Sequence, residues 1–384
     1  MQSATRTLFA EEHEIFRRSV AAFIDQEIRP HHETWEDQGC VTRELWRKAG
    51  AAGLLCCDVA EAYGGPGADF LYNTVVIEEL ARSGFSGPAA GFGVHSDMAS
   101  TYISGFGSEH QRKRYLPGMC AGTTIVAIAM TEPGAGSDLQ GMQTYAERDG
   151  DEYVISGQKT FISNGQLADV VVLACKTDRS QGARGVSLII VETEREGFRR
   201  GRNLKKLGMK AQDTSELFFD GVRVPVENRL GEEGQGFKML MKNLARERLV
   251  QAIRACAQTE AVIEWTIEYT RERKAFGKTI ADFQNTRFEL ADIAAQVAAG
   301  RALVDQQLQS YLRGELDAVA AAKSKLFLTQ MHCAAVDRCL QLFGGYGYMW
   351  EYPITRAYAD ARVSKIAGGS VEIMKEIIAR DLFS

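Results

Sequence analysis

The sequence predicts an α+β fold made of three consecutive parts, and three observations support this prediction. The first third of the chain shows helical spacing of apolar residues, the segment after residue 122 is a run of short Val- and Ile-rich stretches, and long helical periodicity returns at residue 234. A chain of 384 residues also exceeds the size at which one hydrophobic core usually stops growing. We therefore expect an N-terminal helical domain at 1–122, a middle antiparallel β domain (a barrel or sandwich) at 123–232, and a C-terminal four-helix bundle at 233–384.

The N-terminal part is expected to be mainly helical. Its first helix covers Glu11–Glu27, and Pro30 ends it because proline disfavours helical geometry in the residue before it. Thr42 is a suitable N-cap for a second helix that ends at Ala52. Two more helices are expected at Asp69–Ser83 and Gln111–Met119, and two Gly-rich loops at Tyr63–Gly67 and Gly87–Gly93.

The middle part has the pattern of a β domain. Its β-branched segments are bounded by glycines and charged turns at short spacing, and no helical pattern separates them. A run of strands without intervening helices favours an antiparallel arrangement over a βαβ arrangement. The expected strands are Thr124–Met130, Asp151–Ser163, Val170–Thr177, Val186–Glu192 and Ser215–Val224.

Long helices are expected in the C-terminal part, where Pro353 is the only proline. The longest, Gly236–Glu272, carries apolar residues along one face. Long antiparallel helices with short links pack as a bundle. The other expected helices are Phe283–Arg313, Leu316–Phe343 and Ser370–Leu382.

The composition excludes several classes of function. A net charge of −5 argues against a nucleic-acid partner. The 8 cysteines lack the paired spacing of metal ligands, so we expect no metal site, and they are typical of buried residues in a reducing compartment. No apolar stretch reaches the roughly 18 residues of a membrane span, and the first residues are not a secretory signal. We expect a soluble protein of a bacterial-type cytoplasm, or of the mitochondrial matrix if a transit peptide was removed.

Three glycine-containing motifs are candidate sites, and each also has a purely structural explanation. In Thr131–Asp138 (TEPGAGSD), the glycines either let backbone N–H groups face an anionic or heterocyclic ligand or simply form a turn. Arg273–Lys278 (RKAFGK) either complements a helix dipole or binds phosphate. Gln341–Gly347 (QLFGGYG) is either a helix C-cap or backbone passing close to a cofactor. Signatures of NAD-binding Rossmann folds, P-loops, α/β-hydrolases and zinc proteases are missing.

Together, these motifs and their order resemble the acyl-CoA dehydrogenase family. The similarity covers essentially the whole chain and rests on TEPGAGSD, GDEYVISGQKTFISNG, ERKAFGK followed by Gln284, QLFGGYGY and GGSVEIMKEIIAR. The segments KAQDTSELFF, YMWEYPI and IMKEIIARD are most similar to the long-chain branch of the family. The resemblance implies an acyl-CoA substrate, FAD bound without a Rossmann fold, electron-transfer flavoprotein as the electron acceptor, and a homotetramer built as a dimer of dimers.

The resemblance also implies which residues bind FAD. Residues bordering or stacking behind the flavin are Thr131, Gly136, Ser137, Phe161, Ile162 and Ser163, although many family members have Trp and Thr in place of this Phe and of the last Ser. Residues reaching the pyrophosphate and adenosine side from a second subunit are Arg273 and Gln284, with Phe276 in support. The adenosine-side groove is lined by Gln341, Leu342, Gly344 and Gly345, and Ser370 and Glu372 follow the catalytic loop.

The catalytic base is expected at one of two places that the family uses. Most members carry a carboxylate in a YEGT-like loop near the C-terminus, but here Gly368 stands at the carboxylate position of the Ala367–Ser370 segment. Isovaleryl-type and long-chain-type members place the base on the long helix, directly before an arginine, which matches Glu247 and Arg248. A Glu beside an Arg on a helix is usually a solvated pair, so the assignment of Glu247 depends on the resemblance.

The implied reaction is the α,β-dehydrogenation of an acyl-CoA to the trans-2-enoyl-CoA. A carboxylate removes the pro-R α-proton, for which it must be partly desolvated so that its pKa rises, and hydride passes from the β-carbon to flavin N5. The resemblance implies that the Gly368 N–H binds the thioester carbonyl and that Arg248 orients Glu247 or the CoA chain. The remaining implied substrate contacts are Ser137, Leu244 and Gly369. Local similarities favour medium or long straight acyl chains.

Other functions stay open at this point. The same chemistry suits an acyl-CoA oxidase, although the chain is short for the extended oxidase type, or a dehydrogenase of carrier-protein-bound acyl groups. A catalytically silent FAD-binding subunit predicts that no acyl-CoA bleaches the flavin spectrum. A flavin monooxygenase on the same fold would not need an α-proton base, which Glu247 disfavours.

Overall fold

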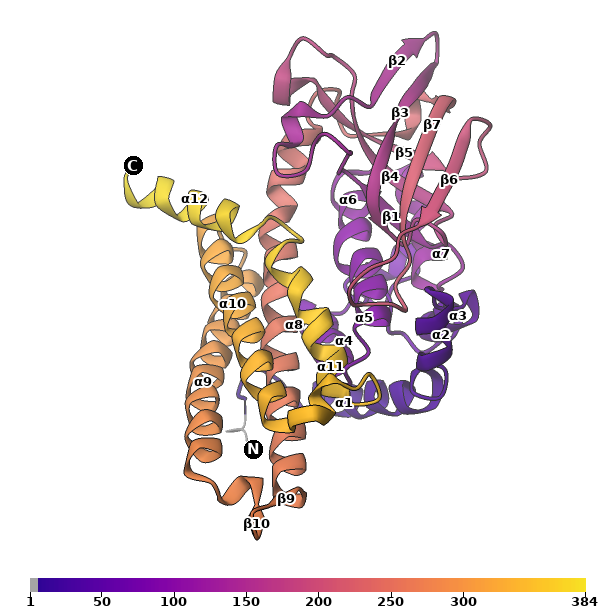
Figure 1. Ribbon diagram of the computed structural model, residues 1–384. Coiled ribbons are helices and arrows are strands. Elements are labelled where there is room, and N and C mark those ends of the chain that lie inside the picture. The colour runs from indigo at the N-terminus through magenta and orange to yellow at the C-terminus, as the bar shows by residue number, and fades with distance from the viewer. Residues whose placement is uncertain (1–5) are drawn as a thin grey trace.

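Three regions meet along one long helix, α8 (Gly236–Glu272), in the computed structural model, which describes residues 6–384 (Figure 1). In this view the N-terminal helices lie on one side of α8, α9 and α10 lie on its opposite side, and the sheet lies beyond its N-terminal half. The predicted order of a helical, a β and a second helical part is therefore confirmed.

The N-terminal region contains the four predicted helices, with ends shifted by a few residues. Asp69 caps one of them by accepting a hydrogen bond from the Leu71 N–H at 2.8 Å, whereas Thr42 stands at an N-cap without a side-chain hydrogen bond. The α-helices are α1 (Glu11–Phe23), α2 (His32–Gln38), α3 (Arg43–Ala51), α4 (Phe70–Arg82), α5 (Ser86–Gly93), α6 (Ser100–Phe106) and α7 (Glu109–Cys120), and π-helical turns cover Ile24–Ile28 and Val94–Ala99.

The prediction of a loop at Gly87–Gly93 is wrong, because this segment is the buried helix α5. Its glycines serve close packing instead of a turn. A Cβ atom added at Gly87 would lie 2.8 Å from the Ala211 Cβ, and one at Gly91 would lie 2.8 Å from the Gln212 Oε1. Because these glycines lack a Cβ atom, α5 packs more closely against the segment that contains Ala211 and Gln212 than it could with larger residues at these positions.

The β region is a single sheet of eight strands in the order β6-β7-β3-β2-β4-β5-β8, with β1 beside β4. All five predicted strands are present. The antiparallel prediction holds for most pairs but is wrong for two, because β1 and β2 both run parallel to β4. The β2–β3 hairpin lies between β1 and β4 in the chain and gives room for the crossover that a parallel pair needs. The strands are β1 (Val126–Ala129), β2 (Tyr145–Asp149), β3 (Glu152–Ser163), β4 (Val170–Lys176), β5 (Val186–Glu192), β6 (Phe198–Asn203), β7 (Thr214–Pro225) and β8 (Arg229–Leu230).

The C-terminal region contains the four predicted helices and one that was not predicted. Pro353 does not interrupt a helix but begins α11, where its missing N–H has no intrahelical partner to lose. Besides α8, the elements are the β9–β10 hairpin (Lys274–Ala275 and Lys278–Thr279), α9 (Gln284–Leu312), α10 (Ala318–Phe343), α11 (Pro353–Ala361) and α12 (Val371–Leu382). Short 3₁₀ turns cover Glu61–Tyr63, Leu139–Gly141, Gly182–Gly185, Val226–Asn228, Ile280–Asp282, Gly344–Tyr348 and Arg362–Lys365.

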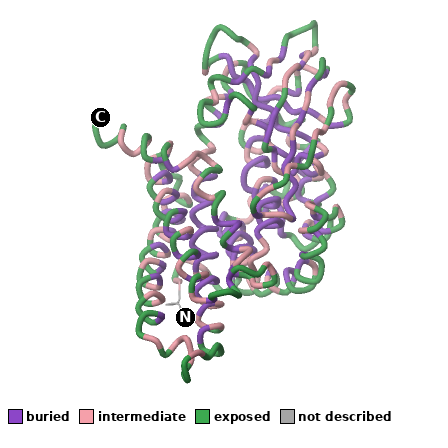
Figure 2. Tube along the Cα trace, in the orientation of Figure 1, coloured by how far each residue is buried: buried purple, intermediate pink, exposed green. Residues whose placement is uncertain are grey.

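Burial is concentrated on α8 and in the interior of the sheet (Figure 2). The middle of α8 is buried on all sides because α4, α9 and α10 pack around it, so this helix forms the common core of both helical regions. A helix buried all round is an unusual place for charged residues. Within residues 6–384, no helix is both long and apolar enough to cross a membrane.

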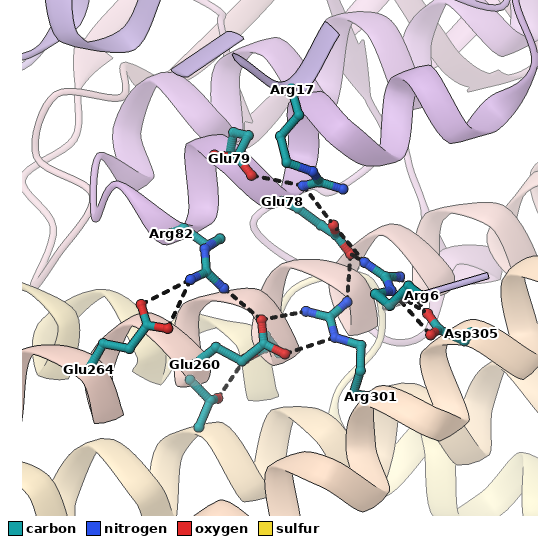
Figure 3. A network of polar contacts seen from close by, with 11 residues as sticks. Arg6, Arg17, Glu78, Glu79, Arg82, Glu260, Glu264, Arg301 and Asp305 are labelled. Carbon is teal, nitrogen blue, oxygen red and sulfur yellow. Dashed lines mark hydrogen bonds and ion pairs between the residues drawn. The ribbon is translucent and has the colours of Figure 1, made fainter. Parts of the chain in front are cut away.

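An ion network ties the N-terminal helices to α8 and α9 (Figure 3). The buried carboxylate of Glu78 on α4 pairs with Arg6 at 2.8 Å, Arg17 at 3.1 Å and Arg301 at 2.5 Å. Burial opposes ionisation of Glu78, but the three guanidinium groups outweigh it and lower the pKa to about 2. Arg301 continues to Glu260 at 2.7 Å, which completes a link between three helices.

Candidate active site

Glu247 lies in the buried middle of α8 and carries an unusually placed carboxylate. Its exposed fraction is 3%, and its Oε1 accepts a hydrogen bond from the Tyr102 hydroxyl at 2.8 Å. Burial raises the pKa of Glu247, and the Tyr102 hydroxyl, Arg248 and Arg246 oppose this rise without cancelling it. Among residues 6–384, no donor hydrogen-bonds the second oxygen, Oε2. The carboxylate is thus fixed at one oxygen and has the raised pKa that suits a base.

The flanking arginine Arg246 is neutralised by other groups. Its Nη1 lies 2.5 Å from an Asp58 oxygen and 3.0 Å from the Tyr311 hydroxyl, and its Nη2 lies 3.7 Å from Asp97. Because Asp58 and Asp97 belong to the N-terminal region and Tyr311 belongs to α9, Arg246 links the two helical regions through α8. This pairing leaves Glu247 less influenced by the charge of its neighbour.

Arg248, directly after Glu247, and Lys325 on α10 are two buried cations that lie near each other. Arg248 is 4% exposed, and its Nε has no hydrogen-bond partner in the described part of the chain. Lys325 on α10 is fully buried, and its Nζ donates to the Gly369 carbonyl oxygen at 2.5 Å. Burial and the nearby Arg248 charge lower the pKa of Lys325 to about 8. Arg248 therefore interacts electrostatically with both the Glu247 carboxylate and the Lys325 ammonium group.

The glycine segment 368–369 lies next to the Lys325 side chain. Both residues have left-handed backbones, with φ of +68° at Gly368 and +94° at Gly369, which other residues adopt only with strain. A Cβ atom added at Gly368 would lie 3.6 Å from the Lys325 Cε and 3.7 Å from the Gln251 Cγ. The structure thus places the predicted carbonyl-binding loop against α10 and against α8 one turn after the predicted base.

The predicted flavin-side motif 131–138 lies on the β region, after β1. Glu132 anchors it, because its buried carboxylate accepts hydrogen bonds from the Thr144 N–H at 2.9 Å and from Lys159 Nζ at 2.8 Å. The Thr160 N–H also donates to the Thr131 carbonyl at 2.9 Å. No atom of the described chain lies within 4 Å of a Cβ placed at Gly136. The motif is therefore held rigidly at its base while Gly136 and Ser137 remain exposed.

The neighbouring segment 161–163 presents an aromatic ring to the surface. Phe161 has φ of +59° at an irregularity in the pairing of β3 with β7, and 67% of its surface is exposed. Ser163 is half-buried, whereas the Ile162 side chain points into the core of the sheet, so at Ile162 only the backbone is available to a ligand. A strained backbone and an exposed ring in one residue are typical of a binding site.

The remaining predicted cofactor residues gather at the far end of α8 or follow the glycine loop. The Arg273 guanidinium lies 5.3 Å from the Tyr346 ring, in the turn that follows α10 and contains Gly344 and Gly345. Phe276, in the β9–β10 hairpin, is 94% exposed. Gln284 is the first residue of α9, Gln341 lies in the last turn of α10, and both side chains are exposed. Leu342, which follows Gln341, is half-buried. Ser370 caps α12, with its hydroxyl 3.5 Å from the Ile373 N–H, and Glu372 lies in the first turn of that helix.

The two groups on α8 are far apart within one chain. Arg273 follows Glu247 by 26 residues, which corresponds to about 39 Å along a continuous helix. Figure 1 shows the β9–β10 hairpin at the end of α8 opposite to the sheet. One chain therefore brings Glu247, Leu244, Arg248 and the glycine loop together, but it does not bring Arg273 to them. Leu244 is half-buried one turn before Glu247.

Two residues near the candidate site were not predicted from the sequence. Tyr102 lies in a segment with no recognisable motif, and Lys325 is one of two lysines in a helix whose apolar pattern does not show which of them faces inward. A signal was available for Lys325, since it stands on the buried side of α10 in line with Ala321, Ala322 and Leu328. In the described residues, no cluster of three or more His, Cys, Asp or Glu side chains could hold a metal ion.

Profiles of three domains of one family match the chain in order. They are the acyl-CoA dehydrogenase N-terminal domain at residues 10–123, the middle domain at 127–222 and the C-terminal domain at 234–383. Together they leave few residues unmatched, and each profile falls on one of the three structural regions.

Individual relatives are similar over nearly their full lengths. The mitochondrial long-chain specific acyl-CoA dehydrogenase of Sus scrofa is 48% identical over 379 residues, which span 98% of this chain and 88% of the relative. The crystal structure of an acyl-CoA dehydrogenase from Geobacillus kaustophilus superposes with a TM-score of 0.95 at 45% identity, covering 98% of this chain and 100% of the other. A glutaryl-CoA dehydrogenase from Mycobacterium smegmatis, solved in complex with FADH2, gives a TM-score of 0.92 at 28% identity and covers 98% and 96%.

Proposed function

Because the chain belongs to the acyl-CoA dehydrogenase family, we propose that it dehydrogenates a straight-chain acyl-CoA with FAD and that Glu247 is its catalytic base. The reaction class follows from family membership, in which FAD-dependent dehydrogenation of acyl-CoA thioesters is the shared activity. The enzyme is thus an oxidoreductase that converts an acyl-CoA to the trans-2-enoyl-CoA. The assignment of individual residues is our own.

One observation supports Glu247 more than any other. A carboxylate that is 3% exposed, with a raised pKa and no hydrogen bond at Oε2 from the described residues, lies one helical turn before Gln251. Gln251 borders Gly368, which stands where most relatives carry the base. A buried carboxylate without an ion-pair partner is unfavourable unless it serves a function. The arrangement fits proton abstraction from a carbon acid.

The chain's own residues divide the work of the reaction. Tyr102 holds Glu247 Oε1, so Oε2 is the oxygen that takes the α-proton. The Gly368 N–H binds the thioester carbonyl, where negative charge develops as the proton leaves. Leu244 and Arg248, on the same helix, border the acyl thioester and the CoA chain. The closely packed α8 excludes water from the carboxylate and keeps its pKa raised.

The residues present fit FAD. Gly136 leaves open backbone, and the exposed Phe161 ring offers a stacking surface on the β region. FAD would be held there by Thr131, Gly136, Ser137, Phe161, the Ile162 backbone and Ser163, and on the adenosine side by Arg273, Phe276, Gln284, Gln341, Leu342, Gly344 and Gly345, with Ser370 and Glu372 near the glycine loop. Bound FAD supplies the hydride acceptor at N5.

A second copy of the chain completes the cofactor site in this proposal. Arg273 lies about 39 Å from Glu247 along α8, so it serves the FAD of a partner chain. Exposed aromatic residues support an interface in the C-terminal region, because large exposed rings are unfavourable in water. They are Phe276, Phe288, Tyr348 and Phe383. We propose a homotetramer built as a dimer of dimers.

The physiological setting is also part of the proposal. Electron-transfer flavoprotein is the electron acceptor, as the family resemblance implies. All 8 cysteines are free thiols, which suits a reducing compartment, and we propose the cytoplasm of a bacterial-type cell. Straight medium or long acyl chains are proposed because the long-chain relative from Sus scrofa is 48% identical, whereas an isovaleryl-CoA dehydrogenase is 34% identical.

Anaerobic titration tests the proposed function. The purified FAD-loaded protein is mixed with butyryl-, isovaleryl-, octanoyl- and palmitoyl-CoA, and the flavin absorbance is followed. We expect bleaching by the straight-chain thioesters, fastest with octanoyl- or palmitoyl-CoA. Bleaching by none of them would point to a silent FAD-binding subunit, and bleaching only by acyl groups on a carrier protein would identify a different substrate carrier.

A further inference from the structure

Lys325 is a buried lysine in contact with the glycine loop, and the reaction described above does not use it. It projects from α10, is fully buried, and hydrogen-bonds the Gly369 carbonyl oxygen through Nζ at 2.5 Å. An ammonium group loses its hydration on burial, and a neutral carbonyl replaces only part of it. An apolar side chain of the same length would fill this position without that cost.

The groups around Lys325 increase the free-energy cost of burying its ammonium group. No carboxylate lies within ion-pair distance of Lys325 in residues 6–384, and Arg248 adds a second positive charge nearby. Burial and Arg248 together lower its pKa to about 8. A buried cation kept in such an unfavourable place, in contact with the loop proposed to bind the substrate, indicates a role in function.

The geometry shows what Lys325 acts on. Its Nζ contacts the Gly369 carbonyl, and its Cε lies 3.6 Å from the position that a Cβ would take on Gly368, so the side chain touches Gly369 and borders the open side of Gly368. Both residues have left-handed backbones, which glycine adopts at little cost but also leaves easily. A hydrogen bond from the rigid helix α10 selects one orientation of this flexible segment.

We propose that Lys325 is a positioning residue that holds the Gly368–Gly369 backbone so that the Gly368 N–H faces the thioester carbonyl of the substrate. This inference rests on the proposed function. A donor aimed in advance at the oxygen where charge develops is effective because it needs no reorganisation during the reaction. Lys325 supplies that preorganisation from outside the loop, without touching the substrate.

The test compares ligands with and without the carbonyl. Lys325→Met removes the donor at nearly constant volume, and Lys323→Met, on the same helix but exposed and 3.8 Å from Asp381, is the matched control. Calorimetry on the FAD-loaded proteins measures the affinity for a trans-2-enoyl-CoA and for an S-alkyl-CoA thioether of the same chain length. We expect the K325M affinity for the thioester to fall about tenfold, the equivalent of one hydrogen bond, and its thioether affinity to stay within about twofold.

A measurement of the flavin reduction rate accompanies the calorimetry. The rate of anaerobic flavin reduction by octanoyl-CoA should fall roughly 10- to 100-fold in K325M and remain unchanged in K323M. If K325M does not fold, Lys325→Gln replaces it, since Gln keeps most of the side-chain volume but cannot reach the carbonyl in the same way, and the same preference for the thioether is expected.

The outcomes separate this inference from the proposed function. Equal losses for thioester and thioether, or a K325M rate within twofold of wild type, overturn the role of Lys325 while leaving the dehydrogenase assignment intact. Failure of the wild-type protein to be reduced by any acyl-CoA contradicts the proposed function instead, and in that case the calorimetric comparison still decides whether Lys325 governs binding of the thioester carbonyl.

Discussion

The Tyr102 hydroxyl donates a hydrogen bond of 2.8 Å to the Glu247 Oε1, which joins helix α6 of the N-terminal region to helix α8 of the C-terminal region. Burial raises the pKa of Tyr102 well above its usual value, so this group stays a neutral donor. The bond fixes the rotation of the Glu247 carboxylate and stabilises its ionised form. It therefore both orients the proposed base and limits the rise of its pKa.

Replacing Tyr102 by Phe should shift the pH dependence of the enzyme. Loss of the donor destabilises the carboxylate, so the pKa of Glu247 rises further, and more of the base is protonated at any given acidic pH. A hydrogen bond to a charged group is worth about 1.5–3 kcal/mol, and about 1.4 kcal/mol corresponds to one pKa unit. We expect the acidic limb of the kcat/KM profile to move by about one pH unit toward alkaline pH.

Tyr115→Phe is the control for this shift. The Tyr115 hydroxyl also donates to a carboxylate, that of Glu192, but this pair lies between α7 and β5, away from Glu247. The Y115F profile should coincide with that of wild type. An unshifted profile in Y102F would show that the hydrogen bond does not influence the reacting carboxylate.

Mixed oligomers test the proposal that two chains share each cofactor site. Glu247→Gln and Arg273→Ala chains, each with a different affinity tag, are co-expressed and the mixed oligomer is isolated. If Arg273 serves the FAD of the partner chain, each mixed dimer contains one site with both native residues and regains flavin reduction, whereas either variant alone is inactive. Because about 39 Å of helix separates the two residues, we expect this recovery. Its absence would indicate that one chain supplies both residues to each site.

Replacing Glu78 by Gln should destabilise the protein strongly. The change leaves Arg6, Arg17 and Arg301 around a neutral amide in a buried place. Removing one partner of a buried ionic cluster typically costs about 3–5 kcal/mol. We expect a lower thermal midpoint of the FAD-loaded protein, with full flavin reduction below that midpoint. Glu376→Gln, which breaks an exposed pair with Arg380, should change stability by less than about 1 kcal/mol.

The lowered pKa of Glu78 also predicts that the stability of the protein depends on pH. The folded-state pKa of Glu78, about 2, lies below its usual value of 4.5, so the stabilisation is fully present above pH 4.5 and is lost as the pH falls toward 2. The difference in thermal midpoint between wild type and E78Q should therefore shrink over this range. A constant difference would mean that the network does not hold Glu78 ionised.

The sequence was sufficient to predict most of the fold because long periodic segments carry redundant signals. Gly236–Glu272 was predicted with its observed ends, since 37 residues of one period leave little ambiguity. Short elements were missed where tertiary packing outweighs local pattern. The α5 segment has the glycine content of a loop but is a helix, because its glycines allow contact with Ala211 and Gln212.

Prediction of the site depended on motifs, so it could not include residues that belong to no motif and join the site only through tertiary contacts. Glu247 and Gly368 were identified as a complementary pair, but Lys325 and Tyr102 belong to no motif and become recognisable only through their contacts with Gly369 and Glu247. A hydrogen bond between residues 145 positions apart has no counterpart in local spacing. Burial of a charged side chain was the missing signal, and it requires the folded structure.

The base assignment of Glu247 is tested most directly by rapid anaerobic mixing of Glu247→Gln with octanoyl-CoA. Gln keeps the volume of the side chain and an oxygen for the Tyr102 hydroxyl but cannot accept the α-proton, and loss of a general base typically slows a reaction by about 100- to 10,000-fold. We predict a variant that retains FAD, binds the substrate and reduces its flavin at least 100-fold more slowly than wild type. Flavin reduction in E247Q at a rate close to that of wild type would contradict the assignment.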